Sequence, residues 1–531
     1  MRLTSGLVLL AVATSSLAGV TVQKPGLTVP SRYASQETAA RKLFSTSYDA
    51  YRKYATGHDD LEPISLTTWD GLGGWGASLV DALGTLAVMG ETQEFEDAVN
   101  VIADIDFSTD PAGGTISVFE TTIRWVGGLV SAYELTDGKY PVLITKAQEV
   151  ADKLAFAFVG DNKIPFNQID FSTNQPLTDQ TTNIAQVGTL NLEWGVLSKY
   201  TGNATYGRLT EDAVIAVAEL ATPLPGLAPQ VMDPNTGEFA DAYITWGGGS
   251  DSYFEYLLKW ARYTNNANPI FINTWKTAVD SSIKHLLKQS TVGGWWYLAD
   301  QDDDGNIRHV GSHLACFYAG NWLMGGKLLR NQTIIDIALD LNEGCWNTYA
   351  STTTGIGPET FAFISSDGNY TGGGSISDDQ LAYFEKHGHY ITGADYIQRP
   401  EVLESNFYAW RVTGNTKYLD RAASAIAAFN KYLPAQAGFA GLNDVNDPSA
   451  GLIDDMQSFW FAEVLKYLFL TFDNPSHISL DTYVFNTECH PLKAPPALAT
   501  YDADFIPWKQ WTKPTSTAPR PAVSPMSFSS N

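Results

Sequence analysis

The chain has 531 residues, of which 44% are hydrophobic and 17% are charged, which is enough for one large domain or several ordinary ones. The formal net charge of −25 at pH 7 excludes nucleic acid as an expected partner and disfavours an acidic membrane surface, because phosphate groups bind basic surfaces. Aromatic residues make up 12% of the chain, which permits stacking on sugar rings without arguing for it.

The N-terminus has the pattern of a secretory signal peptide over residues 1–18. Arg2 supplies the positive charge, residues 7–12 the apolar stretch, and Ser16-Leu17-Ala18 the small-residue cleavage site. The apolar run is too short to span a membrane, although a signal anchor is the alternative interpretation. We therefore expect a secreted protein or one in the lumen of the secretory pathway, with no membrane span in the mature chain. Three N-glycosylation sequons agree with export: they begin at Asn203, Asn331 and Asn369.

Helical periodicity dominates the remainder, since apolar residues recur at spacings of three and four. In chain order the pattern predicts helices over residues 77–89, 123–135, 147–158, 190–200, 253–263, 275–288, 403–412 and 459–472. Alternation typical of strands is sparse and lies in connections such as residues 295–298. The predicted class is all-α with short β-hairpins in loops.

Several predicted helices end in similar turns containing Gly or Asn, the residues that suit a left-handed helix C-cap. These turns lie at residues 135–140, 200–203, 263–266 and 412–415, and the first three recur at intervals of 65 and 63 residues. Such a period fits a pair of helices with its connections. It favours one toroid of helical hairpins over residues 35–492, whereas the Ser/Pro/Thr-rich residues 512–531 are predicted to be disordered.

Three cysteines leave one thiol over in an oxidising compartment. Cys316 and Cys345 are close in sequence and each lies beside apolar or aromatic residues, so we predict that they form a disulfide. Cys489 is then expected to be a buried free thiol, and the spacing does not fit a zinc site.

Three acidic motifs at residues 119–124, 250–256 and 399–405 carry the strongest chemical signal. Each places carboxylates beside rings or arginines at a predicted helix start, and Arg124 shares a helix face with Glu120, four residues before it. Glycoside hydrolysis needs one carboxylic acid and one carboxylate. The alternative for any single motif is an ordinary surface acid or favourable charge at a helix N-terminus.

Taken together, the motifs identify a family. Over about residues 51–492 the chain resembles the class I alpha-1,2-mannosidases of glycoside hydrolase family 47. The resemblance rests on Trp69-Asp70, residues 73–83, 119–124, 127–129, 192–194, 251–259, 313–317, 399–401, 462–467 and 485–488, and His490-Pro491.

This resemblance implies a fold, a reaction and a cofactor. The fold would be an (αα)7 barrel, and the reaction inverting hydrolysis of terminal alpha-1,2-linked mannose from high-mannose N-glycans of the Man9GlcNAc2 type. Ca2+ would lie at the base of the barrel, bound through Thr487 and a shell of waters. Glu120 would be the general acid, acting through a water, and Glu401 the general base. Asp251 would be the third catalytic carboxylate, with the division of roles left open.

The resemblance also implies a set of residues around the sugar and the metal. Arg124 and Arg399 would orient carboxylates and sugar hydroxyls. The remaining implied lining residues are Glu193, His313, Glu359, Glu404, Gln457, Glu463 and Glu488. His313 has the alternative of a satisfied buried histidine, and Glu404 and Glu463 that of helix-face acids. Cys316 and Cys345 match the family's disulfide pair.

Two departures from the family pattern affect the expected specificity. Gly249 stands where many members that process a single mannose carry Arg, which indicates broader, Golgi-like trimming of several mannoses. Gln457 stands where many members have Glu, which removes a charge. Gln457 therefore favours the main alternative, a glycan-binding quality-control relative with little or no turnover. A different helical-toroid enzyme, such as a polysaccharide lyase, is disfavoured by the motif at residues 485–488.

Overall fold

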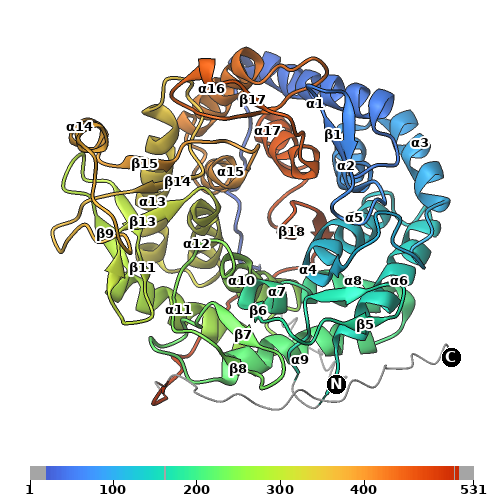
Figure 1. The fold of residues 1–531 in the computed structure, drawn as a ribbon, viewed down its shortest axis with the longest axis horizontal. Coiled ribbons are helices and arrows are strands. Elements are labelled where there is room, and N and C mark those ends of the chain that lie inside the picture. Colours follow the sequence, from blue (N-terminus) through green and yellow to red (C-terminus); the bar gives the residue numbers. More distant parts are fainter. Residues whose placement is uncertain (1–18, 161–162, 508, 513–531) are drawn as a thin grey trace, which may run out of the picture.

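The computed structural model describes residues 19–160, 163–507 and 509–512. The predicted signal peptide and the predicted disordered tail from residue 513 lie outside this part of the chain. The described chain is mostly helical, as the periodicity predicts, and its helices form two concentric layers around a central axis (Figure 1).

The inner layer consists of helices buried on nearly every side. α15 is buried from Glu401 to Val412, and each inner helix contacts the next, with α17 packing against α2 to close the ring. The inner helices are α2 (Ala77–Met89), α5 (Gly127–Leu135), α8 (Asn191–Thr201), α10 (Asp251–Tyr263), α12 (Phe317–Leu328), α15 (Glu401–Thr413) and α17 (Leu465–Phe472).

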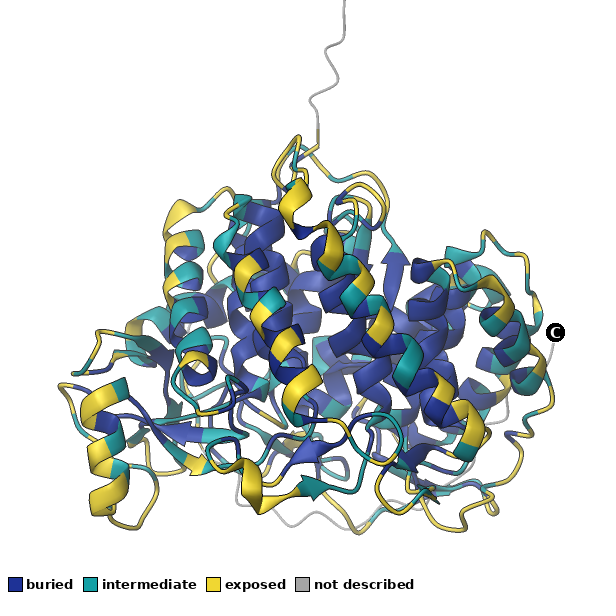
Figure 2. Cartoon of the chain, turned by 90° about the horizontal axis from the view of Figure 1, so that it is seen from above, coloured by how far each residue is buried: buried dark blue, intermediate teal, exposed yellow. Residues whose placement is uncertain are grey.

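The outer layer consists of amphipathic helices, whose exposed faces are visible in Figure 2. In α3, for example, Phe95, Ala98, Val99 and Ile102 are buried, which is the spacing of a single helix face. The outer helices are α1 (Ala34–Tyr54), α3 (Thr92–Ala103), α6 (Val142–Leu154), α9 (Thr205–Glu219), α11 (Ile270–His285), α13 (Gln332–Ala350) and α16 (Lys417–Tyr432).

Shorter helical segments lie in the connections. They are η1 (Ser31–Tyr33), α4 (Val118–Thr121), the π-helical η2 (Thr122–Val126), η3 (Ala155–Ala157), α7 (Ile184–Gly188), η4 (Leu314–Cys316), α14 (Asp378–His387), η5 (Pro448–Ala450) and the π-helical η6 (Trp460–Val464). The predicted helices 123–135 and 459–472 are therefore each divided into a π-helical turn and an α-helix. The predicted helix 147–158 begins earlier, at Val142, directly after Pro141.

All strands are short and pair antiparallel, as expected for hairpins in loops. They are β1 (Asp60–Glu62), β2 (Thr67–Trp69), β3 (Ile116–Ser117), β4 (Gln168–Asp170), β5 (Gln175–Pro176), β6 (Thr182–Asn183), β7 (Val231–Asp233), β8 (Glu238–Phe239), β9 (Leu287–Gln289), β10 (Trp296–Leu298), β11 (Asp300–Gln301), β12 (Ile307–Arg308), β13 (Val310–Ser312), β14 (Thr360–Ala362), β15 (Tyr390–Gly393), β16 (Gly441–Leu442), β17 (Leu452–Ile453), β18 (Tyr483–Phe485) and β19 (Pro491–Lys493).

The β18–β19 hairpin has a special position, because it enters the ring of inner helices (Figure 1). Its turn, residues 486–490, carries the predicted metal ligand Thr487 into the interior. Cys489 within this turn adopts φ 56°, and it is the buried free thiol that the sequence predicts. The predicted disulfide between Cys316 and Cys345 is confirmed, with an S–S distance of 2.05 Å. Within the described residues, no helix combines the length and the apolar character needed to cross a membrane.

Candidate active site

A cavity of about 310 Å³ opens where several inner helices begin. We call it the central cavity. Its lining includes Glu120, Asp251 and Glu401, the three carboxylates singled out in the sequence, although they are more than a hundred residues apart along the chain. Arg124, Arg399, Gly249, Glu463, Thr487 and Glu488 line it as well.

Local structure explains why the carboxylates lie at the cavity. Asp251 and Glu401 are the first residues of α10 and α15, where the helix dipole favours negative charge. Glu120 lies in the short helix α4, whose N-cap Ser117 accepts a hydrogen bond from the Glu120 backbone N–H at 3.2 Å. Three helix starts thus converge on one space.

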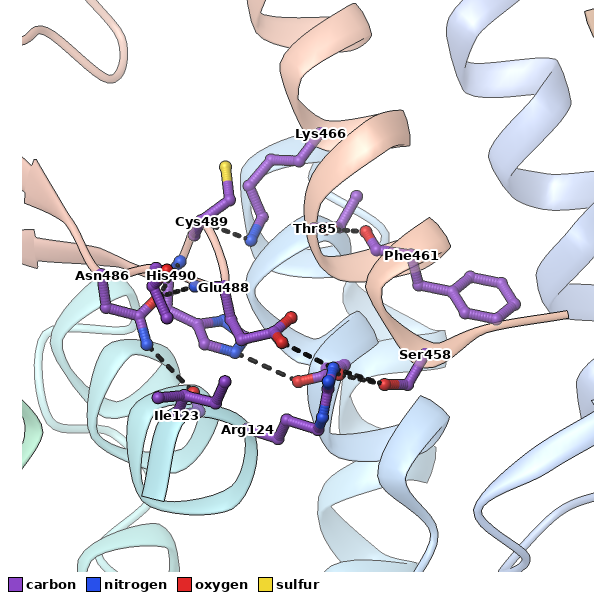
Figure 3. Close-up of polar contacts among 12 residues, drawn as sticks. Thr85, Ile123, Arg124, Ser458, Phe461, Lys466, Asn486, Glu488, Cys489 and His490 are labelled. Atoms are coloured by element: carbon purple, nitrogen blue, oxygen red, sulfur yellow. Dashed lines mark hydrogen bonds and ion pairs between the residues drawn. The ribbon is translucent and has the colours of Figure 1, made fainter. Parts of the chain in front are cut away.

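Arg124 links Glu120 to the β18–β19 hairpin, which we call the central hairpin, and Figure 3 shows its contact with Glu488 in the turn of that hairpin. Its guanidinium lies 2.8 Å from Glu120 Oε2 and 2.6 Å from Glu488 Oε1. Burial lowers the pKa of Arg124, but Glu488 and Glu120 outweigh this effect and raise it well above its usual value. Arg124 is therefore a permanent cation beneath the cavity, whereas the Glu120 side chain stays 32% exposed and is accessible to water.

Glu401 is held by His313, as Nδ1 of the histidine lies 2.6 Å from Glu401 Oε2. On the other side of the ring, His313 Nε2 lies 2.7 Å from Tyr349 Oη. Burial raises the pKa of Glu401, but the hydrogen bond and charge of His313 and the nearby Arg399 guanidinium together hold it below its usual value. Glu401 is therefore ionised at neutral pH.

Asp251 behaves in the opposite way. Burial raises the pKa of Asp251 to about 7, and the charges of Glu255 and Glu401 add to the effect, while Arg399 opposes it. The hydrogen bond from the Ser252 backbone N–H, at 2.8 Å, does not compensate for the lost solvation. Of these two carboxylates, Glu401 is therefore ionised, whereas Asp251 still binds a proton at mildly acidic pH.

This difference predicts an effect of pH on stability. Because the pKa of folded Asp251 is about 7 and that of an unfolded aspartate about 3.9, the folded state binds more protons between these values, and stability falls as the pH rises through them. Asp251→Asn removes this penalty. We expect its melting temperature to exceed that of the parent by about 2–5 °C at pH 7.5 and to match it near pH 4.

The measurement is a series of thermal melts followed by circular dichroism from pH 4 to 8. The control is Asp97→Asn, which changes an exposed carboxylate on the outer helix α3. A stabilisation of Asp251→Asn that is equal at all pH values would contradict the raised pKa.

The turn of the central hairpin is fixed by hydrogen bonds with three elements, η2, α8 and α10. Asn486 Nδ2 donates to Glu193 Oε1 at 2.8 Å and to the Ile123 carbonyl at 2.9 Å. The Thr487 backbone N–H donates to Tyr256 Oη at 3.1 Å, and Tyr256 Oη in turn donates to Glu193. Burial raises the pKa of Glu193 to about 7. This network holds Thr487 at the floor of the cavity.

Five of the residues implied by the family resemblance do not line the central cavity: Glu193, His313, Glu359, Glu404 and Gln457. Four of these five residues support side chains at the cavity or lie buried beside such side chains. Glu359 Oε1 lies 2.5 Å from Arg399 Nε, and burial, together with the neighbouring Glu255, raises the pKa of Glu404 well above its usual value. Gln457 is different, because its side-chain amide donates a hydrogen bond to Asp455, which does not line the cavity either.

The sequence-based prediction missed some residues that contribute to the site. Asp81 of α2 is fully buried and accepts from Ser458 Oγ at 2.5 Å, while Nη1 of Arg124 lies 3.4 Å away. Asn183 and Gln186 line the cavity and form a capping box at the start of α7. The spacing Asn-x-x-Gln is a recognisable sequence signal for such a helix start, whereas nothing local marks Ser458.

The comparisons with known proteins agree with this geometry. The model of glycosyl hydrolase family 47 matches residues 43–494. A probable mannosyl-oligosaccharide alpha-1,2-mannosidase 1B of Aspergillus clavatus is 38% identical over 508 residues, covering 91% of this chain and 97% of the relative. The mannosyl-oligosaccharide alpha-1,2-mannosidase 1B of Emericella nidulans is 39% identical over 482 residues, covering 87% of this chain and 94% of the relative.

A solved structure agrees as well. The alpha-1,2-mannosidase from Trichoderma reesei superposes with a TM-score of 0.84 at 35% identity and covers 87% of this chain and 99% of its own. The family model spans most of the chain, and the relatives match it over nearly their full lengths, so the resemblance seen in the sequence motifs is confirmed. The chain belongs to glycosyl hydrolase family 47.

Proposed function

We propose that this enzyme is an inverting exo-glycosidase that removes terminal alpha-1,2-linked mannose from high-mannose N-glycans. The observation that carries the proposal is the convergence of Glu120, Asp251 and Glu401 on one cavity in a family 47 chain. The names of the relatives, mannosyl-oligosaccharide alpha-1,2-mannosidases, supply the linkage.

The chemistry needs a base that activates water and an acid that protonates the leaving oxygen. Glu401 suits the base, because His313 and Arg399 keep it ionised. The acid step falls to Glu120, which is accessible to water, together with Asp251, which still binds a proton near pH 7. For inversion, acid and base should lie roughly 6.5–9.5 Å apart, with the attacking water between them.

We assign the fold of residues 35–492 as one catalytic (αα)7 barrel. The alternation of inner and outer helices and the closure of the inner ring by α17 and α2 support this assignment. The predicted repeat of turns has the same origin, because each turn ends an inner helix before its outer partner begins, as Thr201 of α8 does before α9.

We propose Ca2+ as the cofactor, bound through Thr487 and waters. Within the described residues, no group of three or more His, Cys, Asp or Glu side chains is arranged to hold a metal. The donor chemistry nevertheless fits a hard cation: Glu193 Oε2 and Glu488 Oε2 are buried without a hydrogen-bond partner among the described residues, and buried acids of this kind can accept from waters around the ion. Bound Ca2+ would polarise sugar hydroxyls and offset this negative charge.

Gly249 and Gln457 bear on specificity. Gly249 lines the cavity without a side chain of its own, and the absence of the large arginine found there in many single-mannose enzymes supports trimming of several mannoses in the Golgi-like manner. The lectin-like alternative drew its support from Gln457. Since the Gln457 side chain does not line the cavity, that support is weak, and we favour the enzyme.

We also propose that the protein is secreted or acts in the lumen of the secretory pathway. The disulfide supports this compartment, because disulfides persist in oxidising environments. Of the predicted N-glycosylation sites, Asn369 is exposed, whereas Asn203 and Asn331 are partly buried. Asn331 additionally caps α13 through its side-chain oxygen, which leaves its amide nitrogen available for a glycan.

Incubating the purified protein with Man9GlcNAc2 tests the proposal, with products identified by mass spectrometry and linkage analysis. We expect loss of alpha-1,2-linked mannose only, and at least about tenfold slower trimming after EDTA, with recovery on adding Ca2+. Ca2+ should also raise the melting temperature, because an ion that binds only the folded state stabilises it.

Two variants sharpen the metal test. Thr487→Val should lose the Ca2+-dependent rise in melting temperature, whereas Thr482→Val, which changes an exposed threonine just before the same hairpin, should keep it. Unchanged trimming and melting in EDTA would refute the Ca2+ assignment. Glycan binding without trimming at any pH would favour the lectin-like alternative.

A further inference from the structure

A second cavity, of about 360 Å³, lies beside the central cavity. We call it the side cavity. It is formed by the three-stranded sheet β13–β14–β15, the hairpin β11–β12 and the segment at residues 245–246. These strands lie together outside the inner ring, next to α12 and α13 (Figure 1). None of the residues to which we assign catalysis or metal binding lines it.

Only a thin wall separates the two cavities. Gly248, Gly249 and Leu314 line the central cavity, whereas Thr245, Ser312 and Ala315, a few residues away on the same two segments, line the side cavity. The wall at Gly247 carries no side chain, and a Cβ there would lie 3.1 Å from Thr245 Oγ1 and 3.2 Å from Ser312 Oγ.

The β13–β14 pair also connects the two cavities. Ser312 pairs with Thr360, and the next pair continues the ladder, since the His313 backbone N–H donates to the Glu359 carbonyl at 2.9 Å. Successive side chains of a strand point to opposite faces. One face therefore holds His313 and Glu359 against Glu401 and Arg399, and the other presents Ser312 and Thr360 to the side cavity.

The side cavity has the chemistry of a sugar site. Its lining includes five hydroxyl-bearing residues, Thr245, Ser312, Thr360, Thr371 and Thr392. Some of these hydroxyls bond within the protein, as Thr392 Oγ1 does to Thr360 Oγ1 at 2.9 Å, but a hydroxyl can both donate and accept and can therefore serve a sugar hydroxyl as well. Trp246 and Phe361 complete the lining, but both rings are buried against other aromatic side chains, so the hydroxyl groups carry the resemblance to a sugar site.

The charged residues of the side cavity point to a neutral ligand. Asp300 and Arg308 are cross-strand partners and contribute one charge of each sign. The Arg308 guanidinium uses three of its five N–H groups, donating to the Thr371 carbonyl at 3.0 and 2.7 Å and to Tyr243 Oη at 3.0 Å. The remaining two can bind vicinal hydroxyls.

We propose that the side cavity binds a second, non-reacting mannose branch of the same glycan whose terminal mannose occupies the central cavity. This inference rests on the proposed function, because it needs a branched mannose substrate. A substrate with one arm in each cavity gains affinity from both, so branched glycans should be preferred over a disaccharide that fills the central cavity alone.

Two variants test the side cavity without touching the catalytic residues. Arg308→Met removes the guanidinium donors, and Thr392→Trp fills the cavity at an exposed residue. Arg52→Met is the matched control, because Arg52 is an exposed arginine on the outer helix α1. For each variant, kcat and KM are measured on Man9GlcNAc2 and on alpha-1,2-mannobiose, with the melting temperature as a check on folding.

We expect both variants to raise KM for Man9GlcNAc2 about 5- to 10-fold, the loss of a few hydrogen bonds, and to leave kcat/KM for mannobiose within about twofold of the parent. Equal losses on both substrates, or no loss on Man9GlcNAc2 in Thr392→Trp, would overturn the proposal. If the parent hydrolyses neither substrate, the proposed function itself fails, and this outcome is distinct from the other two.

The enzyme's own glycan is the competing occupant. Asn369 begins a sequon whose Thr371 lines the side cavity, so a glycan on Asn369 would begin close to it. The measurements are therefore repeated in Asn369→Gln. A persistent effect of Arg308→Met in that background supports the substrate branch, and its disappearance assigns the cavity to the attached glycan and overturns the proposal.

Discussion

Glu401→Gln is expected to lower kcat for Man9GlcNAc2 about 10³-fold, the usual contribution of a general base, with KM changed by less than about threefold. Glutamine keeps the size of the side chain but cannot accept a proton from water. Because Glu401 begins α15 and bonds His313 at 2.6 Å, the neutral substitute retains the local structure. Steady-state kinetics and isothermal titration with the same glycan measure the two effects.

The control for this prediction is Glu37→Gln, in which an exposed glutamate in the first turn of the outer helix α1 is changed. It should leave kcat unchanged. If Glu401→Gln turned over at a rate near that of the parent, Glu401 would not be the base. If it lost glycan binding together with turnover, the residue would serve in binding rather than in proton transfer.

Removing the disulfide by Cys316→Ser/Cys345→Ser is expected to lower the free energy of unfolding by roughly 3–4 kcal/mol, because the bond closes a loop of about 29 residues in the unfolded chain. The bond also acts near the site. Cys316 follows His313 by three residues and Cys345 precedes Tyr349 by four. The side chains of His313 and Tyr349 are hydrogen-bonded to each other at 2.7 Å.

Losing the cross-link should therefore loosen the support of Glu401 as well. With that support weakened, the pKa of Glu401 rises and the acidic limb of the kcat/KM profile moves to higher pH, since the base must be ionised. Denaturant unfolding and a pH series measure the two changes. Cys489→Ser is the matched control, as it alters a buried thiol that forms no disulfide. A loss of stability as large in this control would mean that thiol packing, rather than the cross-link, is responsible.

The inner helices were predictable to within a few residues where their ends carry their own signals. Residues 77–89 form a helix with the predicted bounds, because Gly76 and Gly90 flank it in left-handed conformations at φ 75° and 74°. Helices whose ends lack such glycines were predicted less well. α6 begins five residues before the predicted start, and the outer helix α3 was not predicted although its apolar spacing is regular.

The two π-helical turns were beyond prediction. They precede α5 and α17 and carry Arg124 and Glu463, and the apolar pattern through them is that of an ordinary helix. An extra residue in a turn is accommodated only when the surrounding packing favours it, and that packing comes from α2 and the central hairpin. The apolar pattern of a single segment carries no information about these neighbouring elements.

The sequence by itself identified the family and predicted the three candidate carboxylates and the disulfide, because these follow from residue types and short motifs that can be read along the chain. Only the tertiary structure decided what each carboxylate can do. His313 reaches Glu401 across 88 residues and holds its pKa down, whereas burial raises the pKa of Asp251 to about 7. Two acids at the starts of two similar helices thus acquire opposite proton affinities, because solvation and neighbouring charge are properties of the folded surroundings rather than of the residue.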